Sequence, residues 1–460
     1  MEQYDAILIG AGQANNPLAT TLAGAGWKVA IIEREHVGGT CINEGCTPSK
    51  TMIASARVAH LARRGENYGV HNGPIKMEMT RVRERKRNMV ESFRSGNRQR
   101  LEDAEKVDLL MGEGRFTDSK SVEVRMNDGT TRRLTADKIF INTGQRPRRP
   151  DLPGLDQVSS LNSTTIMELA EVPDHLLVIG GGYVGVEFAQ MFRRFGSDVT
   201  VVQRSGQVLT HEDSDVAQEV IEILREDGIE ILLDTDAERV EEDGEGTITL
   251  HVSTPDGERT LQGSHLLLAV GRIPNTDQLN LEAAGIETDG RGYVEVNDRL
   301  ETNVPGIYAL GDVKGGPAFT HVSYDDFRVV RTNLLEDGDA STADRVLTYT
   351  VFIDPQLGRA GLTEQMARGQ GYDVRVAKMP MSSVARALEV DEPRGVMKAV
   401  VDAETDQILG AAVLGLEGGE VASVLRVAMM GNLPYTALRD AMLPHPTLAE
   451  ALNNLFMSME

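Results

Sequence analysis

Cys41 and Cys46 are the only two cysteines of the 460-residue chain, and both lie in the segment Gly38–Lys50. A pair this close in sequence would stabilise a secreted fold very little, so in a reducing compartment it indicates chemistry. A zinc site would need two more thiolate or imidazole ligands and no cysteine remains, so we expect no metal site. If a helix begins near Cys46, its dipole and Lys50 would both stabilise a thiolate. We favour a redox-active disulfide over the alternative of two inert core cysteines.

Two segments of the chain show the strand–turn–helix–strand order of a βαβ unit, and each contains a glycine-rich turn. The turn and the helix N-terminus of such a unit can bind a pyrophosphate through backbone N–H groups. The first unit consists of Ala6–Ile9, Gly10–Gly12, Leu18–Ala25 and Lys28–Ile32, and the second of Leu176–Gly180, Gly180–Gly182, Val184–Phe195 and Val199–Val202.

The first turn predicts a dinucleotide site because Gly10 and Gly12 follow a buried strand directly. Glu33 closes the next strand, at the position from which a carboxylate accepts hydrogen bonds from a ribose diol. Asn15 stands where the fingerprint has its third glycine. We therefore expect the helix and the strand to pack slightly further apart here.

The second turn carries all three glycines of the fingerprint, Gly180, Gly182 and Gly185. The strand that would end in an acid ends in Gln203 and Arg204 instead. Without a carboxylate a 2′-phosphate is not repelled, and Arg204 can pair with it. We predict NADPH as the coenzyme rather than NADH; the alternative is that Arg204 is a surface arginine without a role.

The bulk composition excludes several classes of partner. The formal net charge is −23 and the pI is about 4.9, an excess of acid that repels nucleic acids and anionic membranes. This charge reflects plain solubility or a high-salt habitat. The chain contains no run of 18 or more apolar residues. It begins without a basic stretch followed by an apolar segment, so we expect no secretory signal and a cytoplasmic location.

The remaining segments suggest how the chain is organised. Residues 75–106 read as a helical segment rich in arginine, which is either a docking patch or, as we favour, a solvated face or an intersubunit contact. Residues 107–145 alternate apolar and polar positions and predict antiparallel strands, with a turn at Asn127–Gly129. Prolines between 147 and 153 mark a linker, and a third, α+β unit begins near residue 344.

The segment Gly39–Lys50 resembles the active-site segment of the class I pyridine nucleotide–disulfide oxidoreductases, and the resemblance covers the whole chain. This family includes lipoamide dehydrogenase, glutathione reductase and mercuric reductase. Residues 320–324 and 381–387 look closest to its mercuric-reductase-like branch. The resemblance implies an α/β fold with two Rossmann-like domains that bind FAD and NAD(P), and a C-terminal α+β domain that forms a homodimer. The implied boundaries are 1–150 and 271–343 for the FAD-binding and central parts, 151–270 for the NAD(P)-binding domain and 344–460 for the dimerisation domain.

The same resemblance implies further residue roles. Thr143-Gly144 and Gly271–Asn275 look like the family's crossings between domains, and Asp312 looks like its second FAD contact. Lys50 and Glu187 resemble the pair that lies near the flavin N5. The residues expected to contact the two nucleotides are Gly10, Gly12, Glu33, Gly39, Thr40, Lys50, Gly114, Thr143, Gly144, Gly180, Gly182, Tyr183, Val184, Glu187, Gln203, Arg204, Gly271, Asp312 and Thr320.

His445 and Glu450 resemble the acid/base motif of the disulfide reductases, in which the histidine crosses the dimer interface and protonates the departing thiolate. A histidine with a carboxylate partner is suited to proton transfer near neutral pH. The alternative for Glu450 is a capping box with Thr447, but a cap does not explain His445. Mercuric reductases instead carry two cysteines near the carboxyl terminus, and the tail Leu455–Glu460 contains none.

We therefore predict a homodimeric FAD enzyme in which NADPH reduces the flavin and the flavin reduces the Cys41–Cys46 disulfide. The resemblance implies that Cys46 faces the flavin, that Cys41 attacks a small disulfide substrate, and that His445, Glu450 and Lys50 assist catalysis. One alternative keeps the enzyme but changes the electron acceptor to a soft metal ion, mercury or copper, or to a quinone. A second alternative is a flavin-bound redox sensor without turnover.

Overall fold

The computed structural model describes residues 1–459, and the chain folds into two units that each combine segments distant in sequence. Unit 1 comprises Met1–Met52, Arg81–Arg148 and Gly271–Arg345. Unit 2 comprises Ile53–Thr80, Arg149–Val270 and the chain from Val346 onward. Among the described residues, no helix combines the length and the apolar character needed to cross a membrane.

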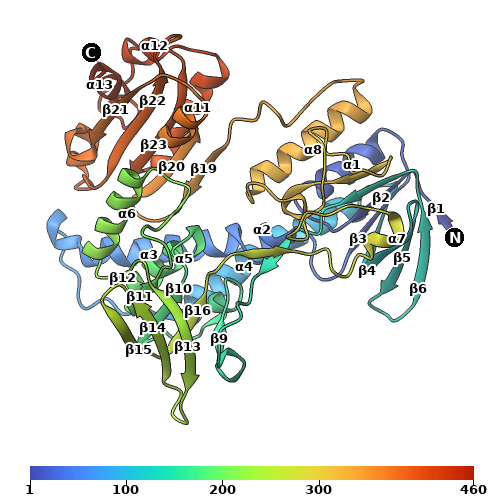
Figure 1. The fold of residues 1–460 in the computed structure, drawn as a ribbon, viewed down its shortest axis with the longest axis horizontal. Helices are drawn as coiled ribbons and strands as arrows, with labels where there is room; N and C mark the ends of the chain where they lie inside the picture. Colours follow the sequence, from blue (N-terminus) through green and yellow to red (C-terminus); the bar gives the residue numbers. More distant parts are fainter. Residues whose placement is uncertain (460) are drawn as a thin grey trace. The chain divides into compact units, whose positions relative to one another are not determined.

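Unit 1 is built on an eight-stranded sheet whose central strands are parallel and buried on both faces (Figure 1). The first predicted strand is confirmed: all four of its residues are buried. The second strand of the predicted βαβ unit lies parallel beside it. In spatial order the strands are β1 (Glu2–Gln3), β6 (Thr131–Thr135), β5 (Ser121–Met126), β4 (Val107–Asp118), β3 (Val29–Glu33), β2 (Ala6–Ile9), β7 (Lys138–Ile141) and β18 (Ile307–Ala309).

Strand β4 joins the two halves of this sheet. Its first half runs parallel to β3, and its second half pairs antiparallel with β5, which in turn pairs antiparallel with β6. The antiparallel strands predicted for residues 107–145 are present in β4, β5 and β6, but the prediction is wrong for β7, which runs parallel to both of its neighbours, β2 and β18. A short antiparallel pair, β8 (Gln145–Pro147) with β17 (Arg272–Pro274), lies where the chain leaves and re-enters unit 1.

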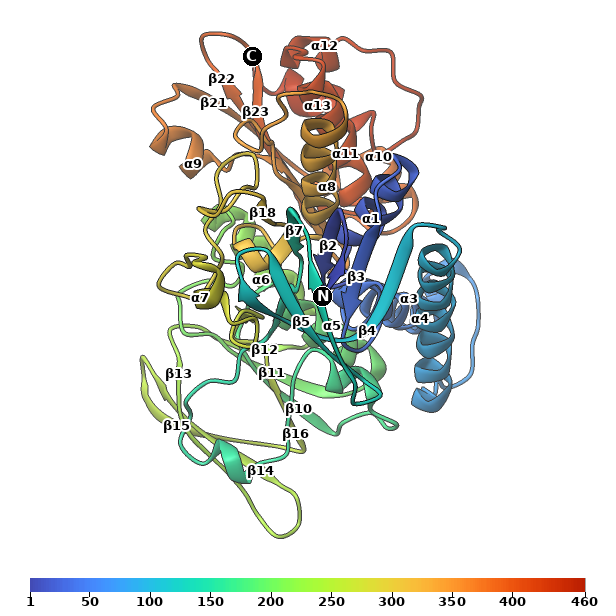
Figure 2. The same ribbon diagram turned by 90° about the vertical axis from the view of Figure 1, so that its right-hand side faces the viewer.

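Helices α1 (Asn15–Gly24) and α8 (Thr320–Leu335) pack side by side against the parallel part of the sheet (Figure 2). Their apolar side chains form one core with the sheet, in which Leu8, Leu18 and Phe327 are almost fully buried. Helix α1 begins three residues before the predicted start. The other helices that begin in unit 1 are α2 (Gly39–Asn43), α3 (Cys46–Arg63), which ends in unit 2, and α7 (Leu281–Ala284).

The arginine-rich helical segment is helix α4 (Met79–Glu102). Several of its arginines pair with acids one turn away, as on a solvated helix face. These ion pairs are Arg81–Glu84 at 2.5 Å, Arg94–Glu91 at 3.3 Å and Arg98–Glu102 at 2.7 Å.

Unit 2 contains the second βαβ unit, in a five-stranded parallel sheet that packs beside a three-stranded antiparallel sheet (Figure 2). The predicted helix after the second glycine turn is α5 (Tyr183–Phe195), which ends at Gly196 as expected. Helix α6 (Ser214–Glu226) follows. The parallel sheet has the order β12 (Glu230–Leu232), β11 (Asp198–Val202), β10 (His175–Ile179), β16 (His265–Leu268) and β9 (Ser160–Leu161), and the antiparallel sheet has the order β13 (Asp236–Glu242), β14 (Ile248–Thr254) and β15 (Gly257–Gly263).

The C-terminal part of unit 2 is a five-stranded antiparallel sheet covered by helices, with its own apolar core. Its strands, in spatial order, are β19 (Thr348–Val351), β20 (Gln356–Gly361), β23 (Ile408–Gly415), β22 (Val396–Asp402) and β21 (Val374–Pro380). Its helices are α9 (Glu364–Gly369), α10 (Ala385–Glu389), α11 (Gly418–Met430), α12 (Tyr435–Arg439) and α13 (Ala451–Met457).

A cluster of buried ion pairs connects elements of unit 2. Asp354 accepts hydrogen bonds from both Arg57 on α3 and Arg194 on α5. Burial opposes ionisation of Asp354, but the two arginines hold its pKa below the usual range. Arg64 pairs with Glu392 at 2.9 Å in the same region. A buried charge of this kind is tolerated because every member has a partner of opposite sign.

His60 lies within this cluster, and it gives unit 2 an acid-sensitive element. Burial and the nearby Arg194 lower the pKa of His60 to about 4. The unfolded chain binds a proton to this imidazole near pH 6.5, whereas the folded chain does not, so stability falls as the pH drops from 6.5 toward 4. Between pH 7 and pH 5, we expect the melting temperature of His60→Leu to decrease less than that of the wild type. The melting temperatures are measured by circular dichroism. If they change equally with pH in the variant and in the wild type, His60 does not contribute to the acid sensitivity.

Candidate active site

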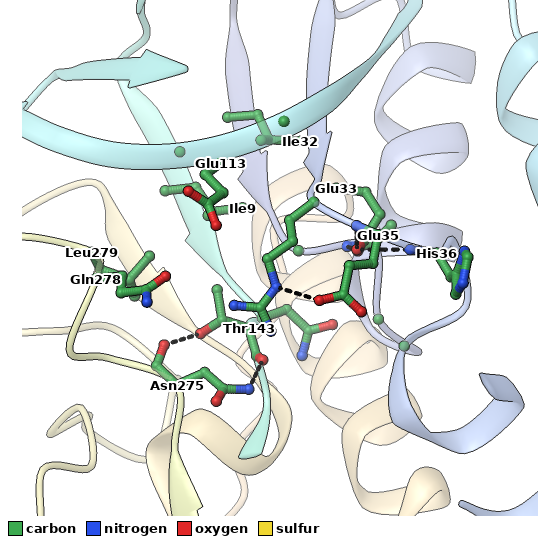
Figure 3. A pocket seen from close by; sticks show the side chains of 18 of the residues that line it. Ile9, Ile32, Glu33, Glu35, His36, Glu113, Thr143, Asn275, Gln278 and Leu279 are labelled. Carbon is green, nitrogen blue, oxygen red and sulfur yellow. Dashed lines mark hydrogen bonds and ion pairs between the residues drawn. The ribbon is translucent and has the colours of Figure 1, made fainter. Parts of the chain in front are cut away.

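A cavity of about 920 Å³ lies in unit 1 at the carboxyl ends of its parallel strands (Figure 3). Ligands bind at this edge of open α/β sheets, next to the glycine-rich turn. The predicted residues that line the cavity are Gly10, Gly12, Glu33, Gly39, Thr40, Gly114 and Thr143. Five other predicted residues of unit 1 are not among its lining residues: Lys50, Gly144, Gly271, Asp312 and Thr320.

The first glycine turn requires its glycines for steric reasons. Gly10 has a φ of 90°, and a Cβ atom on it would lie 2.5 Å from the carbonyl oxygen of Asn142. A Cβ atom on Gly12 would lie 2.4 Å from Oδ1 of the same asparagine. The Ala11 N–H donates to Oε2 of Glu33 at 3.0 Å, which fixes the carboxylate beside the turn. The backbone is therefore exposed to the cavity and can approach a phosphate closely.

Asn15 replaces the third glycine and changes how the helix meets the turn. It is fully buried, and its Nδ2 donates to the carbonyl oxygen of Gly10 at 2.9 Å. At the equivalent place in the second turn, a Cβ atom on Gly185 would lie 1.9 Å from the carbonyl oxygen of Gly180. A residue with a Cβ cannot adopt that packing, so the asparagine inserts its amide instead of allowing the close contact.

Several lining residues were not predicted to contact a nucleotide. One is Asn275, which is hydrogen-bonded to the predicted residue Thr143. Thr143 Oγ1 donates to the carbonyl oxygen of Asn275, and Asn275 Nδ2 donates to that of Thr143, both at 2.9 Å (Figure 3). Asn142 could have been found, because it directly follows β7, whose carboxyl end meets the turn. The other unpredicted residues, which lack a local signal, include Arg34, Glu35, His36, Asn43, Glu44, Glu113, Arg115, Gln278 and Leu279.

Asp312 lies in a short 3₁₀ turn, Gly311–Lys314, that follows β18. Burial raises the pKa of its carboxyl, while Arg272 and Lys314 oppose the shift. The turn is held from below by the fully buried Asp326, which accepts a hydrogen bond from the Gly311 N–H at 2.7 Å. Arg272 donates to the carbonyl oxygen of Gln145 at 2.6 Å.

The two cysteines are brought together as free thiols at the start of a long helix. Cys46 is the first residue of α3, as predicted, and Cys41 lies in the preceding α2. Cys46 Sγ lies 3.3 Å from Oγ1 of Thr320, which is the first residue of α8. A hydrogen bond from Cys41 to Cys46, together with burial, raises the pKa of Cys41, and Thr320 and Lys50 act in the opposite direction. Two helix N-termini therefore meet at Cys46, and both favour a thiolate there.

The second glycine turn lies in unit 2 and has the geometry of the first. Gly180 has a φ of 108°, and a Cβ atom on it would lie 2.4 Å from the carbonyl oxygen of Ala269. The Gly181 N–H donates to Oε1 of Gln203 at 2.8 Å. Gln203 thus takes the place that Glu33 has in the first turn, but with a neutral amide. Arg204 follows it and is exposed.

Three other predicted residues lie on the first turns of α5: Tyr183 and Val184, and Glu187, which was expected near the flavin N5 together with Lys50. Tyr183 is the first residue of this helix, and Val184 follows it. Glu187 is buried, and its Oε1 accepts a hydrogen bond from the Phe352 N–H at 2.8 Å. This hydrogen bond connects the start of α5 with the residue that directly follows strand β19 of the C-terminal sheet.

His445 and Glu450 form the predicted pair. His445 Nδ1 lies 2.9 Å from Oε2 of Glu450, and the histidine side chain is 69 % exposed. Thr447 Oγ1 accepts a hydrogen bond from the Glu450 N–H at 3.2 Å, so half of the alternative capping box is present. The Glu450 carboxylate, however, is engaged by His445. Among the described residues no group of three or more His, Cys, Asp and Glu side chains could hold a metal ion.

Comparison with known proteins agrees with this geometry. Residues 4–326 match the pyridine nucleotide-disulphide oxidoreductase family, and residues 347–456 match its dimerisation domain. The chain is 39 % identical over 460 residues to the probable pyridine nucleotide-disulfide oxidoreductase RclA of Escherichia coli, with 99 % of each chain covered. It is 36 % identical to mercuric reductase of Bacillus cereus, covering 98 % of this chain and 70 % of the relative.

A solved structure is similarly close. The Cu(II) complex of the HOCl-induced flavoprotein disulfide reductase RclA from Escherichia coli superposes with a TM-score of 0.91 at 38 % identity, and each chain is covered completely. The chain therefore belongs to the pyridine nucleotide-disulphide oxidoreductase family, and it is a flavoprotein enzyme with a dimerisation domain that uses FAD and a pyridine nucleotide.

Proposed function

We propose that this enzyme transfers electrons from NADPH, through FAD and the Cys41–Cys46 pair, to a small disulfide. The observation that carries the proposal is that the chain has two neighbouring thiols, Cys41 on α2 and Cys46 at the start of α3, and also an exposed His445–Glu450 pair. A thiol pair alone would serve many acceptors. A histidine oriented by a carboxylate supplies the proton that a departing thiolate needs.

The residues of unit 1 fit FAD. The turn Gly10–Gly12 would hold the pyrophosphate, Glu33 the ribose, and Asp312 the second part of the dinucleotide. We assign 1–150 and 271–343 to FAD binding, 151–270 to NAD(P) binding and 344–460 to the dimer interface. When bound, FAD accepts a hydride from the coenzyme and supplies two electrons to the cysteine pair.

The thiol chemistry follows from the protein's own groups. Cys41 gives its proton to His445 of the partner subunit and attacks one sulfur of the substrate, which forms a mixed disulfide. The first substrate thiolate leaves and takes that proton back. The Cys46 thiolate then attacks Cys41 Sγ, which releases the second substrate thiolate and restores the Cys41–Cys46 disulfide. Glu450 keeps the imidazole oriented. The positive charge of Lys50 acts to lower the pKa of Cys41 and so favours its thiolate.

A second candidate acceptor is Cu(II), because the solved relative was determined as a Cu(II) complex. A cysteine pair can bind and reduce a soft or borderline metal ion. We rank it below a disulfide because Cu(II) reduction needs no proton donor, whereas the His445–Glu450 pair is in place. We further propose a reducing compartment, the cytoplasm, because the active centre must cycle through two free thiols.

The deciding experiment is a screen of NADPH oxidation by the purified holoenzyme. The acceptors are lipoamide, glutathione disulfide, other small disulfides, Cu(II), Hg(II) and quinones. The proposal predicts that one disulfide gives the highest kcat/KM. Turnover with Cu(II) or Hg(II) at a sub-micromolar half-saturation, without comparable turnover of any disulfide, would overturn the ranking.

The coenzyme preference is tested at Arg204. Gln203 leaves no carboxylate beside the 2′-position, and Arg204 is exposed next to it. We expect the wild type to favour NADPH, and Arg204→Ala to lower kcat/KM for NADPH by about ten- to hundredfold while that for NADH stays unchanged. Arg149→Ala serves as a matched control because it is also an exposed arginine of unit 2. A wild type that prefers NADH would contradict the inference from Gln203.

A further inference from the structure

The second glycine turn is connected to a buried ion pair in the C-terminal sheet. Arg359 on β20 is 1 % exposed and Glu212 is 3 % exposed. Arg359 Nε donates to Oε2 of Glu212 at 3.0 Å, and its Nη2 donates to the same oxygen. A pair this deeply buried holds its geometry firmly, because either charge alone would be very costly there.

Tyr349 continues this connection toward the coenzyme. Its hydroxyl donates to Oε1 of Glu212 at 2.5 Å, and Tyr349 itself is 6 % exposed. Its ring lies 5.4 Å from the ring of Tyr183, and the two hydroxyls are hydrogen-bonded. Tyr183 is the first residue of α5, directly after Gly182. A continuous path of contacts thus runs from Arg359 through Glu212 and Tyr349 to the N-terminus where a pyrophosphate binds.

The direction of the hydrogen bonds along this path is fixed. The carboxyl oxygens of Glu212 accept hydrogen bonds from Arg359 and from the Tyr349 hydroxyl. Burial and Glu212 raise the pKa of Tyr349, so this phenol stays protonated and donates a hydrogen bond to Glu212. Because the Tyr349 hydroxyl has no second proton, the Tyr183 hydroxyl must be the donor in the hydrogen bond between the two tyrosines. The contact with Tyr349 therefore positions the Tyr183 side chain.

The same segment holds the turn from a second side. The Leu209 N–H donates to the carbonyl oxygen of Gly181 at 2.9 Å, and the Glu212 N–H donates to that of Leu209 at 2.8 Å. A Cβ atom on Gly181 would lie 2.9 Å from Val208. Fixing Glu212 therefore also fixes the backbone that supports the glycine turn.

We infer that Tyr349 is a positioning residue for the pyridine nucleotide: it holds Tyr183 and, through Glu212, the glycine turn in the conformation that binds the coenzyme. The inference rests on the proposed function, since it takes the second turn as the coenzyme site. It gives a residue of the C-terminal sheet a role in coenzyme binding, in addition to the role of that sheet in the dimerisation domain. Tyr349 touches no reacting atom; it acts through Tyr183.

The test uses the holoenzyme and the variants Tyr349→Phe, Tyr183→Phe and the double variant. Tyr349→Phe retains the ring and its packing and removes only the hydroxyl. We expect it to raise the Kd of NADP⁺ by about three- to tenfold, the range for one lost hydrogen bond, and to slow flavin reduction by NADPH. Reduction of the enzyme by dithiothreitol should keep its wild-type rate. In the Tyr183→Phe background, Tyr349→Phe should add less than a twofold effect, because coupled residues are not additive.

Tyr435→Phe is the matched control, because Tyr435 is a buried tyrosine of helix α12 in the same C-terminal part of unit 2, and it contacts Phe456 and Arg375 instead. The inference is overturned if Tyr349→Phe leaves Kd unchanged, if it adds its full effect in the Tyr183→Phe background, or if Tyr435→Phe has the same effect. Failure of the proposed function looks different, since neither NADPH nor NADH would then reduce the wild-type flavin. If the wild type accepts only NADH, the same titrations are made with NAD⁺.

Discussion

Cys46→Ser is expected to abolish turnover of the disulfide substrate, with a loss of at least about a thousandfold in kcat, while FAD stays bound. Cys46 is the first residue of α3, and its sulfur lies beside Thr320 at the start of α8. Without it, Cys41 can form a mixed disulfide with the substrate, but no second thiol releases it. The measurement is steady-state NADPH oxidation with the acceptor chosen by the screen, together with mass spectrometry of the protein.

Cys41→Ser provides the comparison that separates the two roles. It should lose turnover to the same extent, but it should not accumulate a mixed disulfide, because Cys46 is assigned to the flavin side. NADPH should still reduce the flavin in both variants, as seen by loss of its visible absorbance. Equal accumulation of mixed disulfide on both variants would contradict the assignment, and full turnover of either would contradict the proposed mechanism.

His445→Gln is expected to lower kcat for the disulfide by at least about a hundredfold. The imidazole takes the proton of the attacking thiol and returns it to the leaving thiolate, and an amide can do neither. The rate of flavin reduction by NADPH, measured in a stopped-flow instrument, should remain at the wild-type value. Turnover of Cu(II), if it occurs, should also be little affected, because that reduction needs no proton donor.

The chain offers a matched control for this experiment. His251 is also a partly exposed histidine beside a glutamate, with Nε2 of His251 at 3.0 Å from Glu241, but it lies on the antiparallel sheet of unit 2. His251→Gln should leave all rates unchanged. If His445→Gln turns over the disulfide as fast as this control, the histidine has no acid/base role and the case for a disulfide over a metal ion is lost.

The sequence predicted those parts of the fold that depend on local patterns. Buried strands next to glycine turns located both βαβ units, because short apolar runs and left-handed glycines are strong local signals. The helix start at Cys46 was an assumption made for the cysteine segment, and the pairing of His445 with Glu450 was expected from the family resemblance; both are present. The boundaries were less accurate: α1 begins at Asn15, three residues before the predicted start at Leu18.

Contacts between distant segments could not be predicted. Nothing local marks Tyr349, Glu212 and Arg359 as neighbours, since they come from a strand, a loop and another strand and meet only in the folded unit. The same holds for Asn275 in the cavity of unit 1, whereas Asn142 directly follows β7 and could have been found. A single sequence reports the period of its elements but not which polar side chains share a buried site.

Asp354 limits how this part of the chain can evolve. It is shared by Arg57 and Arg194, so replacing Asp354 removes a partner from both arginines, and replacing either arginine removes one of the two cations that neutralise the buried carboxylate. Replacement of these three residues one at a time is therefore disfavoured. Relatives should either keep all three residues or replace them together by apolar side chains of similar volume, and the half-replaced intermediates should be rare.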